Sequence, residues 1–94
     1  MKSVLQSEKE CYVCGTTHNL HDHHILFGKP NRSLSEKRGL KVWLCMYHHT
    51  GSNEAVHNNR VLDLKLKKHA QKYYEEHYGS REDFIKEFGR NYLD

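Results

Sequence analysis

Two pairs of metal-ligating residue types stand out in the sequence. Cys11 and Cys14 form the first pair, Cys45 and His48 form the second, and two residues separate the members of each. Thiolate sulfur and imidazole nitrogen are ligands that zinc favours, and four of them complete a tetrahedral site. The alternative is a core in which three thiols and a histidine pack without a metal. Because the paired spacing is typical of zinc sites, we predict one structural zinc ion on these four residues.

Histidine is unusually frequent, with nine among 94 residues, and it supplies a second group of candidate ligands. His23 and His24 are adjacent in a stretch predicted to be a strand, where neighbouring side chains point to opposite faces. One of them can coordinate a metal while the other addresses an attacking water. His49 directly follows His48, and adjacent positions on a helix differ by about 100° in direction. His49 should therefore point away from the zinc and can serve a second metal.

The last ligand of this second group stays open on the sequence alone. His57 lies eight residues beyond His49, and Asn53 lies halfway between them, all on one nominal helical stripe. An intervening glycine can interrupt the helix, so His49, Asn53 and His57 are alternatives. His18 and His21 are predicted to be surface residues in turns.

These ligands lie in a chain whose length suits one domain. We expect a single α+β domain over residues 1–94. Residues 1–10 are polar without clear periodicity and are predicted to be a flexible lead-in. Residues 11–58 carry both ligand groups and form the predicted metal-stabilised core, and residues 59–94 form a helical extension.

Strand signals flank the ligands of the core. Residues 20–27 are predicted to be one strand and residues 40–44 another, with Leu40, Val42 and Leu44 on a single face of the second. Between them, residues 28–39 are predicted to be a polar loop with a turn of helix near its end.

Helix signals dominate the extension. Apolar residues at spacings of three or four predict a long helix that ends at Gly79, with His69 and His77 among its packing residues. Ser80 and Asp83 then match a capping box that begins a last helix.

Composition limits the classes of protein that the chain can represent. Hydrophobic residues make up 36% and the mean hydropathy is −0.94, so the core is small and a metal is a fitting stabiliser. Three cysteines cannot all pair within the chain, and no apolar signal segment precedes them, which argues against a secreted disulfide scaffold. No apolar run approaches the length of a membrane span. We therefore expect a soluble, cytoplasmic protein with no membrane partner.

Basic residues gather between the two strand-like stretches. The net charge of +3 permits contact with a polyanion without demanding it. Locally, Glu36 is the one acidic residue among a run of basic residues that would lie beside the metal ligands: Lys29, Arg32, Lys37, Arg38 and Lys41. We interpret this run as a nucleic-acid contact, with an ordinary solvated loop as the alternative.

Taken in order, Cys-x-x-Cys, His-His-Ile, Leu-Cys-x-x-His-His and a further histidine resemble the HNH nucleases of the ββα-metal superfamily. The resemblance runs from Cys11 to about His57 and is greatest to small zinc-stapled phage versions and to phage recombination-enhancement nucleases. It implies a ββα-metal core, to which the periodicity of residues 59–94 adds an extension of two helices. By resemblance, His23 is a ligand of a catalytic divalent cation, His24 is the general base, and His49 or His57 completes the metal site.

The same resemblance implies a DNA endonuclease that nicks or cuts duplexes with Mg²⁺, Mn²⁺ or another divalent cation. It also implies a phage setting, with a phage or host recombination protein as a further partner.

The chain departs from the family pattern at the family's middle asparagine, where Gly39 and Leu40 stand. A backbone carbonyl or Asn31 is the expected substitute for orienting the base, and Asp22 competes with His23 as a ligand. The alternative function is a catalytically inactive zinc module that binds DNA or a protein partner.

Overall fold

A two-stranded antiparallel ribbon lies at the centre of the computed structural model, which describes residues 2–93. Strand β1 (Leu20–His24) pairs with β2 (Lys41–Cys45), and His24 faces Lys41 across the ribbon. Side chains alternate along each strand, so Val42 and Leu44 enter the core while Trp43 points to the other face. The alternation predicted for the second strand is confirmed. The first strand ends earlier than expected, because the chain turns into the core at Ile25.

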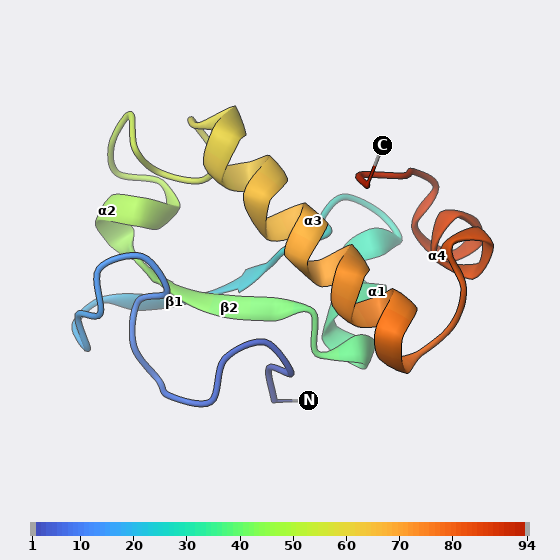
Figure 1. The fold of residues 1–94 in the computed structure, drawn as a ribbon. Helices are drawn as coiled ribbons and strands as arrows, with labels where there is room; N and C mark the ends of the chain where they lie inside the picture. The colour runs from blue at the N-terminus through green and yellow to red at the C-terminus, as the bar shows by residue number, and fades with distance from the viewer. Residues whose placement is uncertain (1, 94) are drawn as a thin grey trace.

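Four helices complete an α+β domain in the part of the chain that the structure describes: α1 (Asn31–Arg38), α2 (Met46–His49), α3 (Arg60–His77) and α4 (Arg81–Phe88). Figure 1 shows α3 running above the ribbon, with α1 and α4 at one end and α2 at the other. None of these helices is both long enough and apolar enough to cross a membrane.

Helix α1 occupies a segment that we expected to be mostly loop. Its sequence lacks an apolar stripe, and its one fully buried side chain is that of Ser35. The Ser35 hydroxyl donates to the Leu26 carbonyl at 2.8 Å and accepts from the Leu26 amide at 3.1 Å. Gly39 then ends the helix at φ 70°, a left-handed conformation that glycine adopts without strain. A tertiary hydrogen-bond pair therefore anchors α1 where periodicity gave no signal.

Helix α2 is a single turn, and the chain beyond it does not resume a helix before Arg60. Instead, residues 50–59 form turns that fold back on α2, with the Val56 amide donating to the His48 carbonyl at 2.7 Å. Ala55 and Val56 are buried by this return. The interruption that Gly51 made possible is therefore present, and the turns bring His57 back beside α2.

The helical extension matches the sequence at its ends. Ser80 and Asp83 form the predicted capping box, and Gly79 follows α3 closely. The buried stripe of α3 includes Leu66, Ala70 and Tyr74, which join Phe84 and Phe88 of α4 in the core.

The packing role predicted for His69 and His77 was wrong. Both are exposed, because the buried stripe of α3 is displaced by about one residue from the one we expected. Their contacts are at the surface, where His77 stacks on Tyr73 and His69 Nδ1 lies 3.1 Å from the Tyr12 hydroxyl.

Residues 2–10 contain no helix or strand and lie along the outer edge of β2. The Val4 amide donates to the Gly39 carbonyl at 2.9 Å, and the Ser3 hydroxyl donates to the Lys41 carbonyl. These contacts tie the segment expected to be a flexible lead-in to the ribbon; residue 1 lies outside the described residues.

Candidate metal centres

Cys11 and Cys14 of the turn before β1 lie beside Cys45, the last residue of β2, and His48 of α2, and the four side chains form one cluster. Their ligand atoms all lie within 4.8 Å of one another. The Cys14 and Cys45 sulfurs are 3.8 Å apart, and His48 Nδ1 is 3.4 Å from the Cys45 sulfur and 3.7 Å from the Cys11 sulfur. All three thiols are free.

These distances match a tetrahedral ion. With bonds of about 2.3 Å to sulfur and about 2.0–2.1 Å to nitrogen, two sulfurs lie about 3.8 Å apart and a sulfur and a nitrogen about 3.5 Å apart. A disulfide would need two sulfurs at about 2.05 Å. The four residues therefore lie close enough to bind one metal ion, in an arrangement consistent with structural zinc.

The turn at residues 11–15 prepares the first two thiols. Gly15 adopts φ 78° and donates its amide to the Cys11 carbonyl at 2.8 Å, which closes the turn. Burial alone raises the pKa of the Cys11 thiol, but hydrogen bonds from the backbone amides of Cys45, Cys14 and Val13 outweigh it and lower the pKa to about 6. Cys11 is therefore inclined to the thiolate form that binds metal.

A second cluster joins His23 of β1, His49 of α2 and His57 of the turns that follow. Their ring centroids are 4.8 to 5.2 Å apart, and the Nε2 atoms of His49 and His57 are 3.2 Å apart. Two nitrogens on one tetrahedral zinc would lie about 3.3 Å apart. Asn53, the alternative ligand, lies on an exposed turn between the two.

The buried ring of His23 is the clearest sign of a ligand in this second cluster. His23 is 2% exposed, and its Nε2 has no hydrogen-bond partner among residues 2–93. An unpaired buried polar atom is costly, so such an atom calls for an explanation. A metal ion held jointly with His49 and His57 would be such a partner, since the three imidazoles lie close enough together to hold one.

The surroundings of His23 and His49 keep these two imidazoles neutral. Burial, followed by the nearby charges of His49 and His57, lowers the pKa of His23 to about 3. Burial, followed by His57, lowers the pKa of His49 to about 4. Neutral imidazole is the form that coordinates metal, so neither side chain must lose a proton to do so near neutral pH.

His21 was predicted to be a surface residue, and the structure gives it a role that the sequence did not indicate. It is half-buried on β1, two residues from His23 on the same face. Its Nδ1 lies 2.8 Å from His49 Nδ1, a hydrogen bond that orients the His49 ring with Nε2 toward the cluster.

His24, the predicted base, points to the other face of β1 and is held by Glu36. The distance from His24 Nε2 to Glu36 Oε1 is 2.8 Å. Lys41 supports the carboxylate at 2.9 Å and also pairs with Asp22 at 3.1 Å. Asn31, one expected substitute for the missing family asparagine, instead donates to the Phe88 carbonyl. Sequence reasoning missed Glu36 as an orienting residue because it did not place a full helix at α1.

A cavity of about 150 Å³ connects the base to the second cluster. It opens between the end of β1, the start of α1 and the turns after α2, and its lining includes His23, His24, Arg32, His49 and His57. The structure thus gathers one candidate base, three candidate ligands and one guanidinium around a single space.

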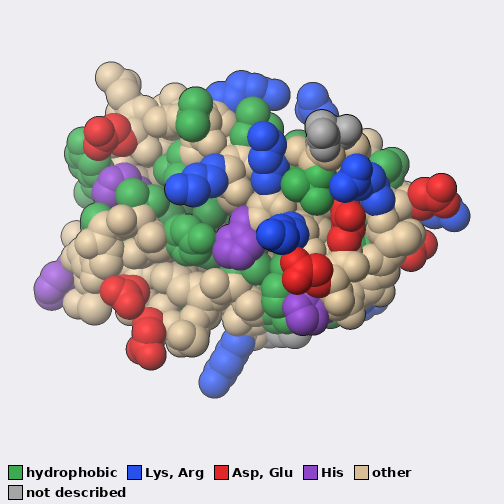
Figure 2. All heavy atoms as spheres, viewed as in Figure 1, with side chains coloured by type: hydrophobic (Ala, Val, Ile, Leu, Met, Phe, Trp, Pro, Cys, Tyr) green, Lys and Arg blue, Asp and Glu red, His purple; other side chains and the backbone are tan. Residues whose placement is uncertain are grey.

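The five basic residues predicted to contact nucleic acid differ in what surrounds them. Lys29, Arg32 and Lys37 are exposed. Arg38 is engaged by Glu87 through two hydrogen bonds of 2.9 and 3.1 Å, and Lys41 is engaged as described above. On the face that Figure 2 shows, further Lys and Arg side chains lie mostly over α3 and toward the upper edge, with Asp and Glu scattered around them.

Comparisons with protein-family models, with curated proteins and with solved structures found no match.

Proposed function

We propose that this chain is a metal-dependent DNA endonuclease of the HNH type, with His24 as its general base. One observation carries the proposal: His24 and the cluster of His23, His49 and His57 line the same small cavity. The adjacent histidines on β1 thus address one space from two faces of the strand. Phosphodiester hydrolysis needs this pairing of a proton acceptor with a cation site.

The first cluster, in this proposal, holds a structural zinc ion. It ties the turn that precedes β1 to the corner where β2 meets α2. The strand that carries His23 and His24 is thereby fixed against the helix that carries His49. A chain with so small a core gains both stability and alignment from such a link.

The contact with Glu36 prepares His24 for proton transfer. Because the carboxylate accepts from the N–H at Nε2, the lone pair of the neutral ring resides on Nδ1. That nitrogen can take the proton of an attacking water, and Glu36 then stabilises the imidazolium that forms. Glu36 therefore replaces, in function, the asparagine that the family pattern would place elsewhere.

The donor set of the second cluster favours particular cations. A divalent ion held by His23, His49 and His57 would stabilise the negative charge that develops on the phosphate and on the leaving oxygen. Imidazole nitrogens suit Zn²⁺, Ni²⁺ and similar ions better than Mg²⁺, which prefers oxygen. His21 holds the His49 ring in place for the ion.

In this proposal, exposed Lys and Arg side chains near the cavity contact the DNA backbone. Arg32 lines the cavity and its planar guanidinium can hold the scissile phosphate by two hydrogen bonds. Lys29 and Lys37 are exposed on the same connection and extend the positive surface.

A plasmid assay tests the proposal. Supercoiled DNA is incubated with zinc-loaded protein and Mg²⁺, Mn²⁺ or Ni²⁺, beside His24→Ala and the control His18→Ala, an exposed histidine outside the clusters. The wild type should nick, His24→Ala should be slower by about 10²- to 10⁴-fold, and His18→Ala should match wild type. Equal nicking by wild type and His24→Ala, or no nicking by wild type with any metal, would contradict it. Binding without cleavage would indicate an inactive zinc module.

A further inference from the structure

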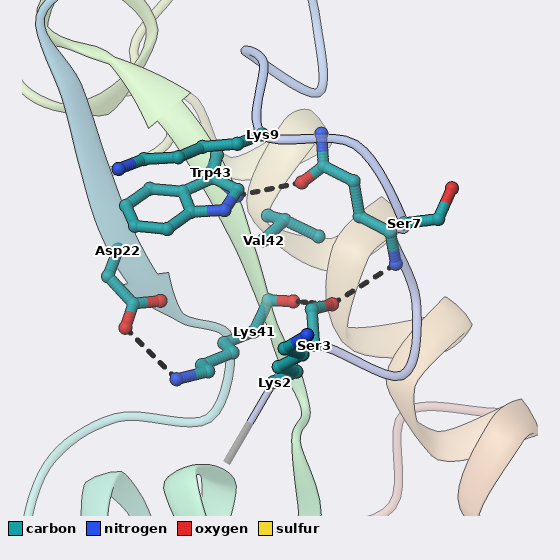
Figure 3. Close-up of a pocket in the computed structure, with 9 residues that line it drawn as sticks. Lys2, Ser3, Ser7, Lys9, Asp22, Lys41, Val42 and Trp43 are labelled. Atoms are coloured by element: carbon teal, nitrogen blue, oxygen red, sulfur yellow. Dashed lines mark hydrogen bonds and ion pairs between the residues drawn. The ribbon is translucent and has the colours of Figure 1, made fainter.

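A second, larger pocket lies on the face of the ribbon opposite the core. Its volume is about 520 Å³, and its walls are β2 and the chain before Cys11. The residues that matter are two exposed lysines, an aromatic ring and a paired cation and anion: Lys2, Lys9, Trp43, Lys41 and Asp22. Figure 3 shows the Lys9 side chain lying along the Trp43 ring, with Asp22 and Lys41 reaching toward each other nearby.

Hydrogen bonds to the backbone of β2 hold the outer wall of this pocket in place. The Gln6 side-chain oxygen accepts from the Trp43 amide at 2.8 Å, and the Tyr12 amide donates to the Trp43 carbonyl at 2.8 Å. The Ser3 hydroxyl donates to the Lys41 carbonyl, two residues earlier on β2. The wall is thus fixed to the strand at Lys41 and at Trp43, and the hollow between wall and strand is part of the fold.

The ring of Trp43 can serve as a stacking platform. Trp43 is half-buried, and the Lys9 ammonium sits 4.7 Å from its ring centroid. Lys9 is exposed on a flexible stem, so it can move aside. Stacking of a nucleobase on an aromatic ring is stronger than an exposed cation–π contact, so a base can displace the lysine.

The charges of the pocket fit a nucleotide. Lys41 is engaged by Asp22 and Glu36, which leaves Lys2 and Lys9 to contact a phosphate. The Asp22 carboxylate lies opposite Trp43 across the ribbon, and one of its oxygens pairs with Lys41 at 3.1 Å. Its other oxygen can accept a hydrogen bond from a base amino group. An aromatic ring flanked by exposed lysines is the combination that single-stranded nucleic acid binders use.

The pocket lies beside the proposed base. Trp43 pairs with Asp22 and Lys41 pairs with His24 across the ribbon, so all four side chains share one face. Trp43 is two residues along β2 from Lys41, about 7 Å, which is the scale of one nucleotide in an extended strand. A strand whose phosphate reaches His24 can therefore place a neighbouring base at Trp43.

We propose that this pocket binds one unpaired nucleotide of the DNA strand next to the scissile phosphate, with its base on Trp43 and its phosphate at Lys2 and Lys9. This inference rests on the proposed nuclease function and names its substrate class as single-stranded or branched DNA. Bases inside a paired duplex are stacked on their neighbours and cannot reach Trp43 unless they are extruded.

Fluorescence of Trp43, the single tryptophan of the chain, tests the inference without any cleavage. Zinc-loaded protein without a second metal is titrated with an oligonucleotide of about ten nucleotides, single-stranded or as a blunt duplex. Single strands should quench the emission to saturation, and duplex should quench it far less. Equal quenching by both forms, or single-strand binding that leaves the emission unchanged, would overturn the inference.

Variants locate the contact, with binding followed by the polarisation of a labelled single strand. Trp43→Ala should weaken binding by about ten- to a hundredfold, and Trp43→Phe should bind within a few-fold of wild type. Lys9→Glu should also weaken binding, whereas Lys65→Glu, the same charge change on the exposed side of α3, should have little effect. If Trp43→Ala fails to fold, Trp43→Phe and the two lysine variants still test the inference. Equal losses of binding from Lys9→Glu and Lys65→Glu would contradict a contact at this pocket.

The two proposals fail separately. If the protein nicks plasmid DNA but single strands do not quench the emission of Trp43, the nuclease function is supported and the nucleotide-binding pocket is contradicted. If single strands quench the emission but the protein never cleaves DNA, the nuclease function is contradicted and the nucleotide-binding pocket is supported.

Discussion

Replacing His48 by alanine should have a different effect on the protein from replacing the adjacent His49 by alanine. His48 Nδ1 lies 3.4 Å from the Cys45 sulfur, within the Cys11, Cys14, Cys45 cluster. His49 faces His23 and His57 instead. We predict that His48→Ala loses the structural zinc and much of the fold, and that His49→Ala keeps both and loses only the second metal.

The size of the difference follows from the loss of a whole ion. Structural zinc contributes about 10–16 kcal/mol in small domains, which is comparable with the entire stability of a domain, about 5–15 kcal/mol. For a domain of this length about 1 kcal/mol corresponds to about 4–8 °C, so His48→Ala should lower Tm by about 40 °C or more, or show no cooperative transition. Without a second metal, His49→Ala loses its hydrogen bonds to His21 and His57, worth about 1 kcal/mol each.

Thermal unfolding followed by circular dichroism, together with zinc content by mass spectrometry, measures both outcomes. Each variant is prepared with one equivalent of zinc and melted before and after addition of Ni²⁺. Wild type should gain stability on addition, since the ion binds the folded state, and His49→Ala should not. If His49→Ala melts as low as His48→Ala, or if His48→Ala retains its zinc, the division into two metal sites is wrong.

Three further predictions concern the histidines and their neighbours. The folded-state pKa of His23, about 3, lies below its unfolded value of about 6.5, so its contribution to stability is present above about 6.5 and is lost as pH falls. Wild type should therefore lose about 1.6 kcal/mol more than His23→Leu between pH 6.5 and 5 in urea unfolding without a second metal, and parallel losses would contradict this. Glu36→Gln should lower kcat by about tenfold or more while Glu76→Gln, an exposed control, does not; equal rates would remove Glu36 from the mechanism. Arg32→Ala should reduce the salt dependence of DNA binding by about one unit of slope, and an unchanged slope would exclude a phosphate contact.

The features of the fold that could be predicted from the sequence are those that depend on residues close together in the chain. The alternation of Val42 and Leu44 and the capping box of Ser80 and Asp83 depend on near neighbours, and the structure has both. The pairing of Cys11 with Cys14 and of Cys45 with His48 is equally local. Because structural zinc takes four ligands, the two pairs could be predicted to bind the same ion although they lie far apart in the chain.

The features that the sequence did not reveal depend on contacts between distant residues. Helix α1 is anchored by Ser35 to Leu26, so no periodicity marks it, and Glu36 could not be placed beside His24. His57 reaches His49 through a turn secured by the Val56 amide, which a helical register cannot describe. Such contacts are set by tertiary packing, which overrides local preference.

The dependence of DNA cleavage on the second metal tests the central claim most directly. Protein that holds one zinc per chain is titrated with Ni²⁺ or Mn²⁺, and the nicking rate is measured beside the fraction of chains that carry a second ion. The rate should rise in proportion to that fraction and level off at one added ion per chain, and His23→Ala should show neither the binding nor the rise. A rate that is already maximal without the second ion, or that ignores its binding, would contradict the account.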